Sequence, residues 1–356
     1  MKAVILVGGQ GTRLRPLTCN IPKAIVPLLN RPYLEYLLSY LKKHGVNDIV
    51  LAMGYNPEPI KKSLGDGSHL GVHLSYVVED VPLGTAGAVK NAASALDDTF
   101  IVFNGDILTE LDLSEMVRLH KKNRPEVSIA LTPVENPTIY GVVETDSKNR
   151  VQRFVEKPPW AEVTTNMINA GVYIVEPEIL NKIPPGTRYM FEHHLFPGLL
   201  REGSAMLGYK SDEYWIDIGT PQKYLKAHHD LMKKWPGNEV KTEGKSQIHS
   251  SAFVEGPVVI GDGCIIEAGA RILGPTVVGP GCRICQDAVI ESSVLWGNSS
   301  IGGSTRIRDC VIGSRVVVEN QADLEECVVG DDITIKTGNK FERGASVWPE
   351  GCDGTN

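Results

Sequence analysis

Residues 3–27 read AVILVGGQGTRLRPLTCNIPKAIVP, an apolar run followed by a turn rich in glycine and basic residues. The apolar run, Ala3–Val7, predicts a buried first strand. The turn contains Gly8, Gly9, Gly11, Arg13, Arg15 and Lys23. Glycines allow the backbone to bend sharply and to approach a ligand, and exposed N–H groups in such a turn can bind phosphate oxygens. Because arginine and lysine add positive charge, the segment predicts a binding site for a polyphosphate.

The spacing of this turn excludes two common phosphate-binding loops. A P-loop ends in Gly-Lys followed by Ser or Thr, whereas this chain has Gly11-Thr12-Arg13. The dinucleotide-binding fingerprint needs a third glycine at the position of Leu14. Taken alone, the turn is equally compatible with a glycine turn that carries basic residues on the protein surface.

The whole stretch resembles the signature of the sugar-1-phosphate nucleotidyltransferases, GGxGTRLxPLTxxxPKxxxP. The matching positions are Gly8, Gly9, Gly11, Thr12, Arg13, Leu14, Pro16, Leu17, Thr18, Pro22, Lys23 and Pro27. The resemblance implies that the nucleotide is bound by Gly8, Gly9, Gly11, Thr12 and Arg13. It also implies catalytic roles for Arg13 and Lys23, which would act on the triphosphate.

Composition restricts the class of protein. A chain of 356 residues predicts two domains, and a net charge of −7 argues against nucleic acid or an anionic membrane as the main partner. Its apolar runs all fall short of the roughly 18–20 residues of a membrane helix, and the first strand leaves no room for a signal peptide. Seven scattered cysteines do not resemble a secreted disulfide framework. We therefore expect a cytoplasmic protein without a membrane partner.

Up to about residue 235, short apolar runs alternate with amphipathic stretches, which predicts an α/β domain with a Rossmann-like, mainly parallel sheet. The expected strands are Ala3–Val7, Asp48–Met53, Leu74–Glu79, Phe100–Asn104, Val127–Val134 and Val151–Val155. The expected helices cover about 32–44, 86–96 and 114–123, with Gly45 as a C-terminal stop and Ser114 as an N-cap. Ligands bind beyond the carboxyl ends of parallel strands, where the glycine turn and Gly105-Asp106 lie.

After a linker at residues 236–247, aliphatic residues recur every six positions, with occasional five-residue steps. The series is Ile248, Val254, Ile260, Ile266, Ile272, Val278, Ile284, Ile290, Leu295, Ile301, Ile307, Ile312, Val318, Leu324, Val329 and Ile335. A period of six excludes a helix and is typical of a hexapeptide-repeat β-helix, expected over residues 248–350. The resemblance is to the left-handed parallel form, with some five coils. We expect this domain to mediate a homo-oligomer.

The repeat also explains most of the cysteines. Cys264 and Cys282 are one coil apart, so we expect them to stack at equivalent interior corners. Cys282 and Cys285 form a Cys-x-x-Cys pair, but the chain lacks a second pair with zinc spacing. A role as small buried hydrophobic residues is therefore favoured over a metal or redox site.

Two aspartates follow apolar segments and are candidate metal ligands. Asp106 ends the run VFNGD, and Asp217 lies in YWIDIGTP. Taken singly, each aspartate is more typical of a turn or a helix cap. The resemblance implies that both hold Mg²⁺, which takes few carboxylates and completes its ligands with substrate phosphates and water. It also gives Asp106 a catalytic role.

A second group of residues matches the sugar side of the family. Glu156-Lys157-Pro158 follows the strand at 151–155, and in isolation such a lysine is usually solvated. The resemblance implies that Lys157 is catalytic and binds the sugar phosphate. It places Glu156 and Asn169 at the sugar, together with the loop that contains Gly141.

Base recognition is expected where Leu83–Gly87, LGTAG, opens a helix, through Gly84, Thr85 and Ala86. Small residues let a flat base approach the backbone, although Thr85 could instead be an N-cap. The LGTAG form, NMINAGVY at 166–173 and FEHHLFP at 191–197 are similar to those of guanylyltransferases that act on mannose 1-phosphate. The adjacent histidines at 193–194 replace the charged pair usual there. Like those at 228–229, they are interpreted as surface or packing residues.

The resemblance implies transfer of a nucleotidyl group from a nucleoside triphosphate to a sugar 1-phosphate, with GTP and mannose 1-phosphate as the favoured substrates. The alternatives are a thymidylyl-, uridylyl- or adenylyltransferase for glucose 1-phosphate and a non-catalytic sensor of sugar nucleotides. Acyl transfer by the β-helix is a further alternative, but His249 is the one histidine of the repeat and lies near its start.

Overall fold

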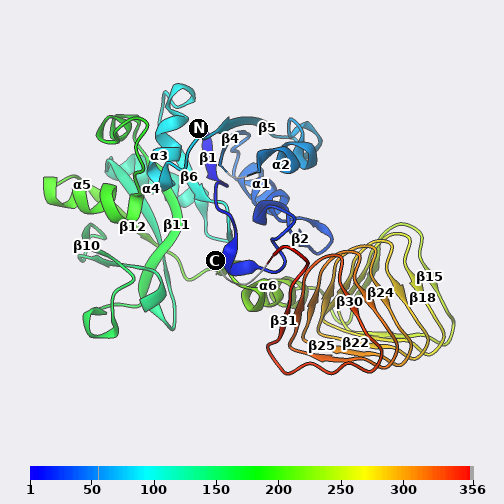
Figure 1. Ribbon diagram of the computed structural model, residues 1–356. Coiled ribbons are helices and arrows are strands. Elements are labelled where there is room, and N and C mark those ends of the chain that lie inside the picture. Colours follow the sequence, from blue (N-terminus) through cyan, green and yellow to red (C-terminus); the bar gives the residue numbers. More distant parts are fainter. Residues whose placement is uncertain (55, 353–356) are drawn as a thin grey trace. The chain divides into compact units, whose positions relative to one another are not determined.

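The computed structural model describes residues 1–54 and 56–352, which divide into two compact units (Figure 1). The first, here called the sheet unit, comprises Met1–Gly9 and Leu34–Ile216. The second, the coil unit, comprises Gln10–Tyr33 and the chain from Asp217 onward. The glycine turn therefore leaves the sheet unit after Gly9, and the following segment, residues 10–33, is here called the loop segment.

The sheet unit contains a nine-stranded mixed sheet in which seven strands follow the order β10-β9-β11-β6-β1-β4-β5, while β8 pairs with β11 and β12 with β8. The strands are β1 (Ala3–Leu6), β4 (Asp48–Met53), β5 (His73–Val78), β6 (Phe100–Asn104), β8 (Val127–Pro133), β9 (Gly141–Thr145), β10 (Val151–Glu156), β11 (Met167–Val175) and β12 (Met206–Lys210). The expected parallel arrangement is confirmed for β6, β1, β4 and β5. Strands β9, β11 and β12 were not expected, and β11 runs antiparallel to β6, β8 and β9.

The central strands are apolar along their length because both of their faces are covered. Ala3, Val4 and Ile5 of β1 are 0% exposed, and the first four residues of β6 are buried as well. Parallel strands covered on both faces have such continuous apolar runs. This is why their positions could be predicted within a residue.

The helices of the sheet unit are α1 (Tyr33–Lys43), α2 (Pro57–Leu64), α3 (Gly84–Asn91), α4 (Leu113–Asn123) and α5 (Phe196–Glu202). Helix α1 and its stop at Gly45, which has φ +76°, are confirmed. The expected cap of α4 is wrong, since the carboxylate of Asp112 accepts the backbone N–H of Glu115 at 2.9 Å. Helix α3 ends at Asn91, and a 3-10 turn, Ala93–Ala95, replaces its expected last turn. The short strand β7 (Ile107–Thr109) pairs with β13 (Trp215–Asp217).

The coil unit contains a β-helix of three parallel sheets (Figure 1). The first sheet is β14 (Val240–Thr242), β17 (Val258–Ile260), β20 (Thr276–Val278), β23 (Val294–Leu295), β26 (Val311–Ile312), β29 (Val328–Val329) and β31 (Ser346–Val347). The second is β15 (Gln247–Ile248), β18 (Ile265–Ile266), β21 (Arg283–Ile284), β24 (Ser300–Ile301), β27 (Val317–Val318) and β30 (Thr334–Ile335). The third is β16 (Phe253–Glu255), β19 (Arg271–Leu273), β22 (Val289–Glu291), β25 (Arg306–Arg308) and β28 (Asp323–Glu325).

The six-residue period correctly identified the interior of this β-helix. From Ile260 to Ile335, every member of the predicted series belongs to one buried core. Ile248 differs, with 41% of its surface exposed, because it lies in the first coil. Cys264 and Cys282 are buried in the same core, and burial raises the pKa of the Cys282 thiol to about 12. Both thiols therefore stay protonated and act as small hydrophobic groups, as expected.

Other elements of the coil unit attach to the β-helix. Helix α6 (Pro221–Lys233) places the Tyr224 hydroxyl where it accepts the Trp296 indole N–H at 2.9 Å and donates to the carbonyl of Pro27. The amide of Asn30 donates to the carbonyl of Val278 at 3.2 Å. The loop segment, which contains the short strands β2 (Pro27–Leu28) and β3 (Arg31–Pro32), is therefore bound to the β-helix. Strand β14 lies within the expected linker, because the first coil begins earlier than the repeat does.

A disulfide joins Cys19 of the loop segment to Cys352, with a Cα–Cα distance of 6.1 Å. This pair has no local signature in the sequence, because 333 residues separate the two cysteines. The remaining five cysteines are free. The expectation of a chain without a disulfide framework is therefore corrected at this one pair.

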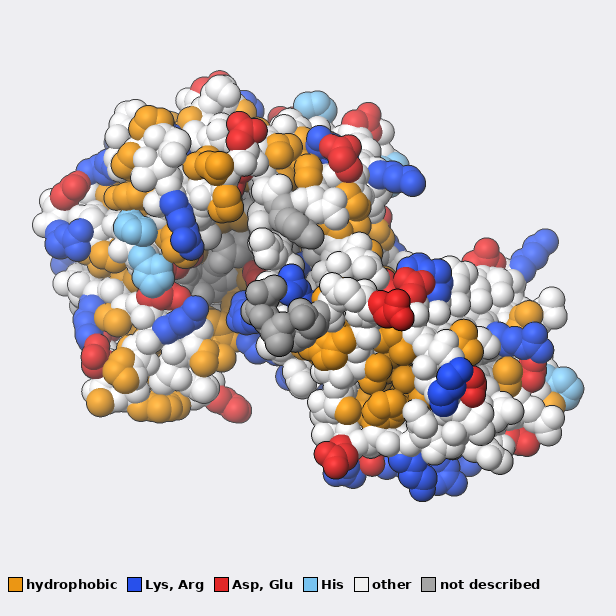
Figure 2. Space-filling model, viewed as in Figure 1, with side chains coloured by type: hydrophobic (Ala, Val, Ile, Leu, Met, Phe, Trp, Pro, Cys, Tyr) orange, Lys and Arg blue, Asp and Glu red, His pale blue; other side chains and the backbone are white. Residues whose placement is uncertain are grey.

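The distribution of surface charge and the length of the helices are relevant to the expected absence of nucleic-acid and membrane partners. Acidic and basic side chains are interspersed over the visible face (Figure 2). No helix among residues 1–54 and 56–352 is long and apolar enough to cross a bilayer.

Candidate active site

The first part of the site is the carboxyl edge of the sheet, where β1 and β6 end side by side. Leu6 pairs with Asn104 in the parallel register, so Gly8 and Asp106 follow adjacent strand ends. A Cβ atom on Gly105 would lie 2.5 Å from the carbonyl oxygen of Leu6, so only glycine fits there. A Cβ atom on Gly8 would lie 3.3 Å from the backbone nitrogen of Gly54. Close backbone packing thus brings the glycine turn and the Asp106 carboxylate to one edge.

The second part is the loop segment of the coil unit, which holds two predicted basic residues. Gly11 has φ +67° and precedes the 3-10 turn Thr12–Leu14, in which Arg13 is exposed. The Thr18 hydroxyl donates to the carbonyl of Gly11 at 2.8 Å. A Cβ atom on Gly11 would lie 3.1 Å from the Cβ of Lys23. These contacts fold the segment tightly, so that Gly11 and Lys23 lie in contact.

Asp217 lies at the end of β13 in an environment that compensates its charge. It is 7% exposed and forms an ion pair with Lys223 in the first turn of α6. A Cβ atom on Gly219 would lie 3.0 Å from Asp217 Oδ2 and 3.3 Å from Arg13 Nη2. Glycine at this position therefore allows Arg13 and Asp217 to approach the same point. The sequence reading missed Lys223, because pairing between a strand end and the following helix has no local signature.

The donor set restricts the kind of metal that could bind. Within the described ranges, 1–54 and 56–352, no group of three His, Cys, Asp or Glu side chains could hold a metal ion. Asp106 and Asp217 belong to different units. Mg²⁺ binds through one or two carboxylates together with substrate phosphates. Such sparse carboxylates fit a cation that arrives with a nucleotide better than a resident metal.

The predicted sugar-side residues lie close together on β9, β10 and β11. Gly141 is opposite Glu156 in the β9–β10 ladder, and a Cβ atom on Gly141 would lie 2.8 Å from Glu156 Oε2. Burial, and secondly the charge of Glu192, raises the pKa of Glu156. The ammonium of Lys157 lies 3.6 Å from Glu156 Oε1, and its backbone has φ +49°. An exposed lysine held in the left-handed region is a strained feature of the kind that occurs at functional sites.

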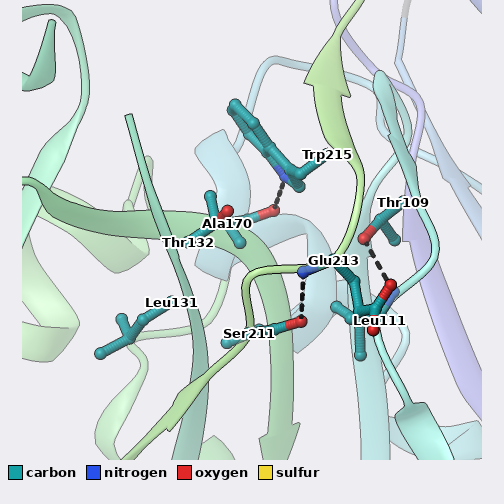
Figure 3. A pocket seen from close by; sticks show the side chains of 9 residues that line it. Thr109, Leu111, Leu131, Thr132, Ala170, Ser211, Glu213 and Trp215 are labelled. Carbon is teal, nitrogen blue, oxygen red and sulfur yellow. Dashed lines mark hydrogen bonds between the residues drawn. The ribbon is translucent and has the colours of Figure 1, made fainter. Parts of the chain in front are cut away.

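Asn169 is fixed by hydrogen bonds on both sides of its amide. Its Nδ2 donates to the Tyr173 hydroxyl at 2.9 Å, and its Oδ1 accepts from the backbone of Gly171 at 3.0 Å. Next to it, the Trp215 indole donates to the carbonyl of Ala170 at 2.9 Å (Figure 3). The cavity beside this contact is too narrow to admit a water molecule, so it serves packing.

Asn104 is a candidate that the sequence reading did not include. Its Oδ1 is buried and has no hydrogen-bond partner among the residues that the structure describes. A Cβ atom on Gly171 would lie 2.7 Å from Asn104 Nδ2, so the amide lies against β11. Buried hydrogen-bond acceptors in proteins normally have a donor, so this oxygen could accept a hydrogen bond from a ligand. The sequence feature that could have identified Asn104 is its position immediately before Gly105-Asp106.

The predicted base-recognition turn is packed against residues 187–192. Gly84 has φ +73°, and a Cβ atom there would lie 2.9 Å from the carbonyl oxygen of Tyr189. The Thr85 hydroxyl donates to Glu192 at 2.9 Å and accepts from the backbone of Phe191 at 3.0 Å. Thr85 is therefore not an N-cap. The Ala86 side chain is 0% exposed and cannot touch a ligand, which leaves the backbone and the Thr85 side chain.

The adjacent histidines have packing or surface roles. His194 stacks on Tyr189 with ring centroids 4.9 Å apart, and its neighbour His193 is exposed. His228 is buried in the coil unit, where burial lowers its pKa to about 4. His229 hydrogen-bonds the carbonyl of Ser292 at 3.1 Å.

Two family models together match most of the chain. The model described as nucleotidyl transferase matches residues 2–234. The model described as the LbH domain of EIF2B subunit epsilon matches residues 238–341. The second match agrees with the expected left-handed β-helix.

Relatives of similar length have several substrates in their names. A mannose-1-phosphate guanylyltransferase of Mycobacterium tuberculosis is 39% identical over 76% of this chain and 77% of the relative. A mannose-1-phosphate guanyltransferase of Schizosaccharomyces pombe is 36% identical over 95% of both chains. A UTP–glucose-1-phosphate uridylyltransferase of Synechocystis is also 36% identical, over 90% of this chain and 89% of the relative.

Solved structures resemble about two thirds of the chain. HddC from Yersinia pseudotuberculosis, complexed with GMP-PN, aligns with a TM-score of 0.57 at 32% identity and covers 65% of this chain and 99% of that one. A putative glucose-1-phosphate thymidylyltransferase from Bacillus anthracis, at 23% identity and a TM-score of 0.60 over 67% of this chain and 98% of that one, shows the fold alone. With the family model covering residues 2–234, the chain belongs to the nucleotidyl transferase family.

Proposed function

We propose that the chain transfers a guanylyl group from GTP to mannose 1-phosphate and forms GDP-mannose and pyrophosphate. The observation that carries the proposal is the strand-end edge, where the glycine turn and Asp106 follow the adjacent parallel strands β1 and β6. Nucleotides bind at such edges. The names of the relatives from M. tuberculosis and S. pombe support the choice of base and sugar.

In the proposed reaction, a phosphate oxygen of the sugar phosphate attacks the α-phosphorus of the triphosphate in line with the leaving group. The bond from the α-phosphorus to the bridging oxygen breaks, and pyrophosphate leaves with the electron pair. Catalysis of this kind consists of positioning and charge neutralisation, without a covalent enzyme intermediate. Arg13 and Lys23 would neutralise the triphosphate, and Lys157 would orient the sugar phosphate beside the glutamate that it contacts.

The remaining assignments follow the resemblance. Gly8, Gly9, Gly11, Thr12, Gly84 and Thr85 would bind the nucleotide, and Gly141, Glu156 and Asn169 the sugar. Asp106 and Asp217 would hold Mg²⁺, which supplies additional neutralisation of phosphate charge when bound. Glu156 lies next to both Gly141 and Lys157, and this proximity supports a common role of the three residues in binding the sugar phosphate.

A uridylyltransferase for glucose 1-phosphate is the second candidate, because the Synechocystis relative covers 90% of this chain at 36% identity. The test is release of pyrophosphate with four nucleoside triphosphates against mannose and glucose 1-phosphates. GTP with mannose 1-phosphate should have the highest kcat/KM. A preference for UTP with glucose 1-phosphate would establish the second candidate instead. Asp106→Asn serves as the inactive control in every combination.

We further propose that residues 1–235 perform the transfer, with 236–247 as the connection, and that residues 248–350 mediate a homo-oligomer in the cytoplasm. Exposed apolar side chains in the first coil support the oligomer, since Ile248 and Phe253 are 41% and 47% exposed. Strands β14, β15 and β16 each end their sheets within the described residues, so their outer edges are available for pairing.

A further inference from the structure

The loop segment contacts the last coils of the β-helix through several residues close to one another in sequence. Pro16 lies against Gly330, where an added Cβ atom would be 3.2 Å from the Cβ of Pro16. The Asn20 side chain hydrogen-bonds Asp331. Cys19 is bonded to Cys352. All of these residues belong to the coil unit, so the β-helix contacts the loop segment within one compact body.

Asp331 is well suited to fix this contact. It is 3% exposed, and its carboxylate also accepts the backbone N–H of Ser314 at 2.8 Å. The adjacent Asp332 is exposed and pairs with Arg315 at 2.6 Å, and the same guanidinium lies 3.9 Å from Asp331. A buried carboxylate needs hydrogen-bond donors to compensate for lost hydration. The Asn20 amide is one of those donors, so the loop segment and the coil stabilise each other.

The disulfide lies next to the contacts that fold the phosphate-binding turn. Cys19 follows Thr18, whose hydroxyl donates to the carbonyl of Gly11 at 2.8 Å. It precedes Asn20, which contacts Asp331. Cys19 and Cys352 are both partly exposed residues, so the bond joins two segments outside the buried core.

We propose that the last coils of the β-helix position the phosphate-binding loop, with Asp331 as a positioning residue and the Cys19–Cys352 disulfide as an anchor that dithiols open. This inference rests on the proposed function in one respect, which is that the KM for the triphosphate is one of its two readouts. It assigns a task to the end of the β-helix that is separate from assembly.

Opening the anchor is a thiol–disulfide exchange. A thiolate of a dithiol reductant attacks one sulfur, forms a mixed disulfide and releases the other cysteine as a thiolate that takes up a proton. The second thiol of the reductant then displaces the protein sulfur. The protein gains two thiols, and the reductant becomes a disulfide after giving up two electrons and two protons.

The test compares oxidised wild type, dithiothreitol-treated wild type, Cys352→Ser and Asn20→Ala. The serine variant removes the bond and the alanine variant removes the loop side of the Asp331 contact, without altering the coil. Because small displacements of binding groups commonly cost up to about 100-fold, we expect the KM for the triphosphate to rise by about tenfold in all three altered forms. The KM for the sugar phosphate should stay within about twofold.

Matched controls separate this effect from general damage. Asp332→Asn changes the neighbouring carboxylate, and Cys285→Ser removes a partly exposed thiol elsewhere in the β-helix. Both should behave like wild type. Cys352→Ser should also be insensitive to dithiothreitol.

Hydrogen exchange gives a readout that does not depend on the substrates. Peptides from residues 10–33 should exchange faster in the reduced and variant proteins, whereas peptides from 141–175 should not change. Equal exchange and equal KM values in all forms would overturn the proposal, as would recovery of Cys19 and Cys352 as free thiols from protein kept oxidised. If no triphosphate is turned over, the proposed function fails and the exchange data still decide this inference.

Discussion

At the residue scale, Lys157 combines exposure with a left-handed backbone conformation. For a residue with a Cβ atom, that conformation costs about 1–2 kcal/mol. Replacement by glycine should therefore leave the free energy of unfolding within about 1 kcal/mol of wild type, because relief of strain offsets the added entropy of the unfolded chain. The same change should lower kcat by about 10²–10³-fold, since it removes the charge that we propose to contact the reacting phosphate.

The control for Lys157→Gly is Arg124→Gly, because Arg124 has φ +50° at the end of α4, away from the predicted site residues. We expect Arg124→Gly to show the same small change in denaturant unfolding and wild-type kinetics. A Lys157→Gly protein with normal kcat would remove the lysine from the site.

His228 makes a prediction for the dependence of stability on pH. Burial lowers its pKa to about 4 from 6.5, so the unfolded chain binds a proton more readily between those values. The stabilisation is therefore complete above about pH 6.5 and is lost as the pH falls towards 4, by up to about 3 kcal/mol. Urea unfolding of wild type and His228→Gln at several pH values should show a larger loss of stability towards pH 4 in wild type than in the variant.

At the element scale, Thr85 ties α3 to the π-helix Phe191–Leu195 through two hydrogen bonds. Thr85→Val leaves the backbone N–H of Phe191 without its acceptor and Glu192 without its donor. We expect a loss of about 1–3 kcal/mol in unfolding free energy, together with a higher KM for the triphosphate. Thr85→Ser keeps the hydroxyl and should restore both quantities. Failure of the serine variant to do so would show that packing, and not the hydrogen bonds, fixes this turn.

Elements differ in how far the sequence could predict them. The β-helix was predictable because each interior position repeats a single environment, and β4 and β6 because their apolar runs are continuous. Strand β11 was missed because Asn169 and Gly171 interrupt its apolar pattern. The Asp217–Lys223 pair and the buried Asn104 amide depend on tertiary packing, which leaves no local pattern.

At the scale of the whole molecule, segments that are distant in sequence contact each other within one compact unit. The loop segment follows β1 in sequence but belongs to the same compact unit as the β-helix. Contacts such as Asn30 with Val278 and Cys19 with Cys352 join residues far apart in the chain. Composition and periodicity describe neighbours in sequence, so they assigned this segment to the first domain.

The exposed first coil of the β-helix is the surface through which we expect copies of the chain to associate. Phe253 is 47% exposed in β16, an outer strand whose sheet continues on one side through β19. In the interior of the β-helix, each coil covers apolar residues of the coil beside it. A second copy of the chain would cover the apolar residues of the first coil in the same way. Phe253→Glu should therefore convert the proposed oligomer into monomers, since a charge buried at such a contact without a partner is strongly unfavourable. Light scattering during size-exclusion chromatography measures the change in mass.

Val317 provides the matched control for this prediction, because it is 43% exposed in β27 between two paired strands. Val317→Glu adds the same charge to the same kind of surface, and its coil already has neighbours on both sides. It should leave the mass and the unfolding midpoint unchanged. If both variants dissociate the oligomer, the contact involves the side of the β-helix, and if neither does, the exposed first coil is not an interface. Since Cys19 and Asn20, which lie beside the phosphate-binding turn, contact the C-terminal end of the β-helix, dissociation by Phe253→Glu should leave the KM for the triphosphate at its wild-type value.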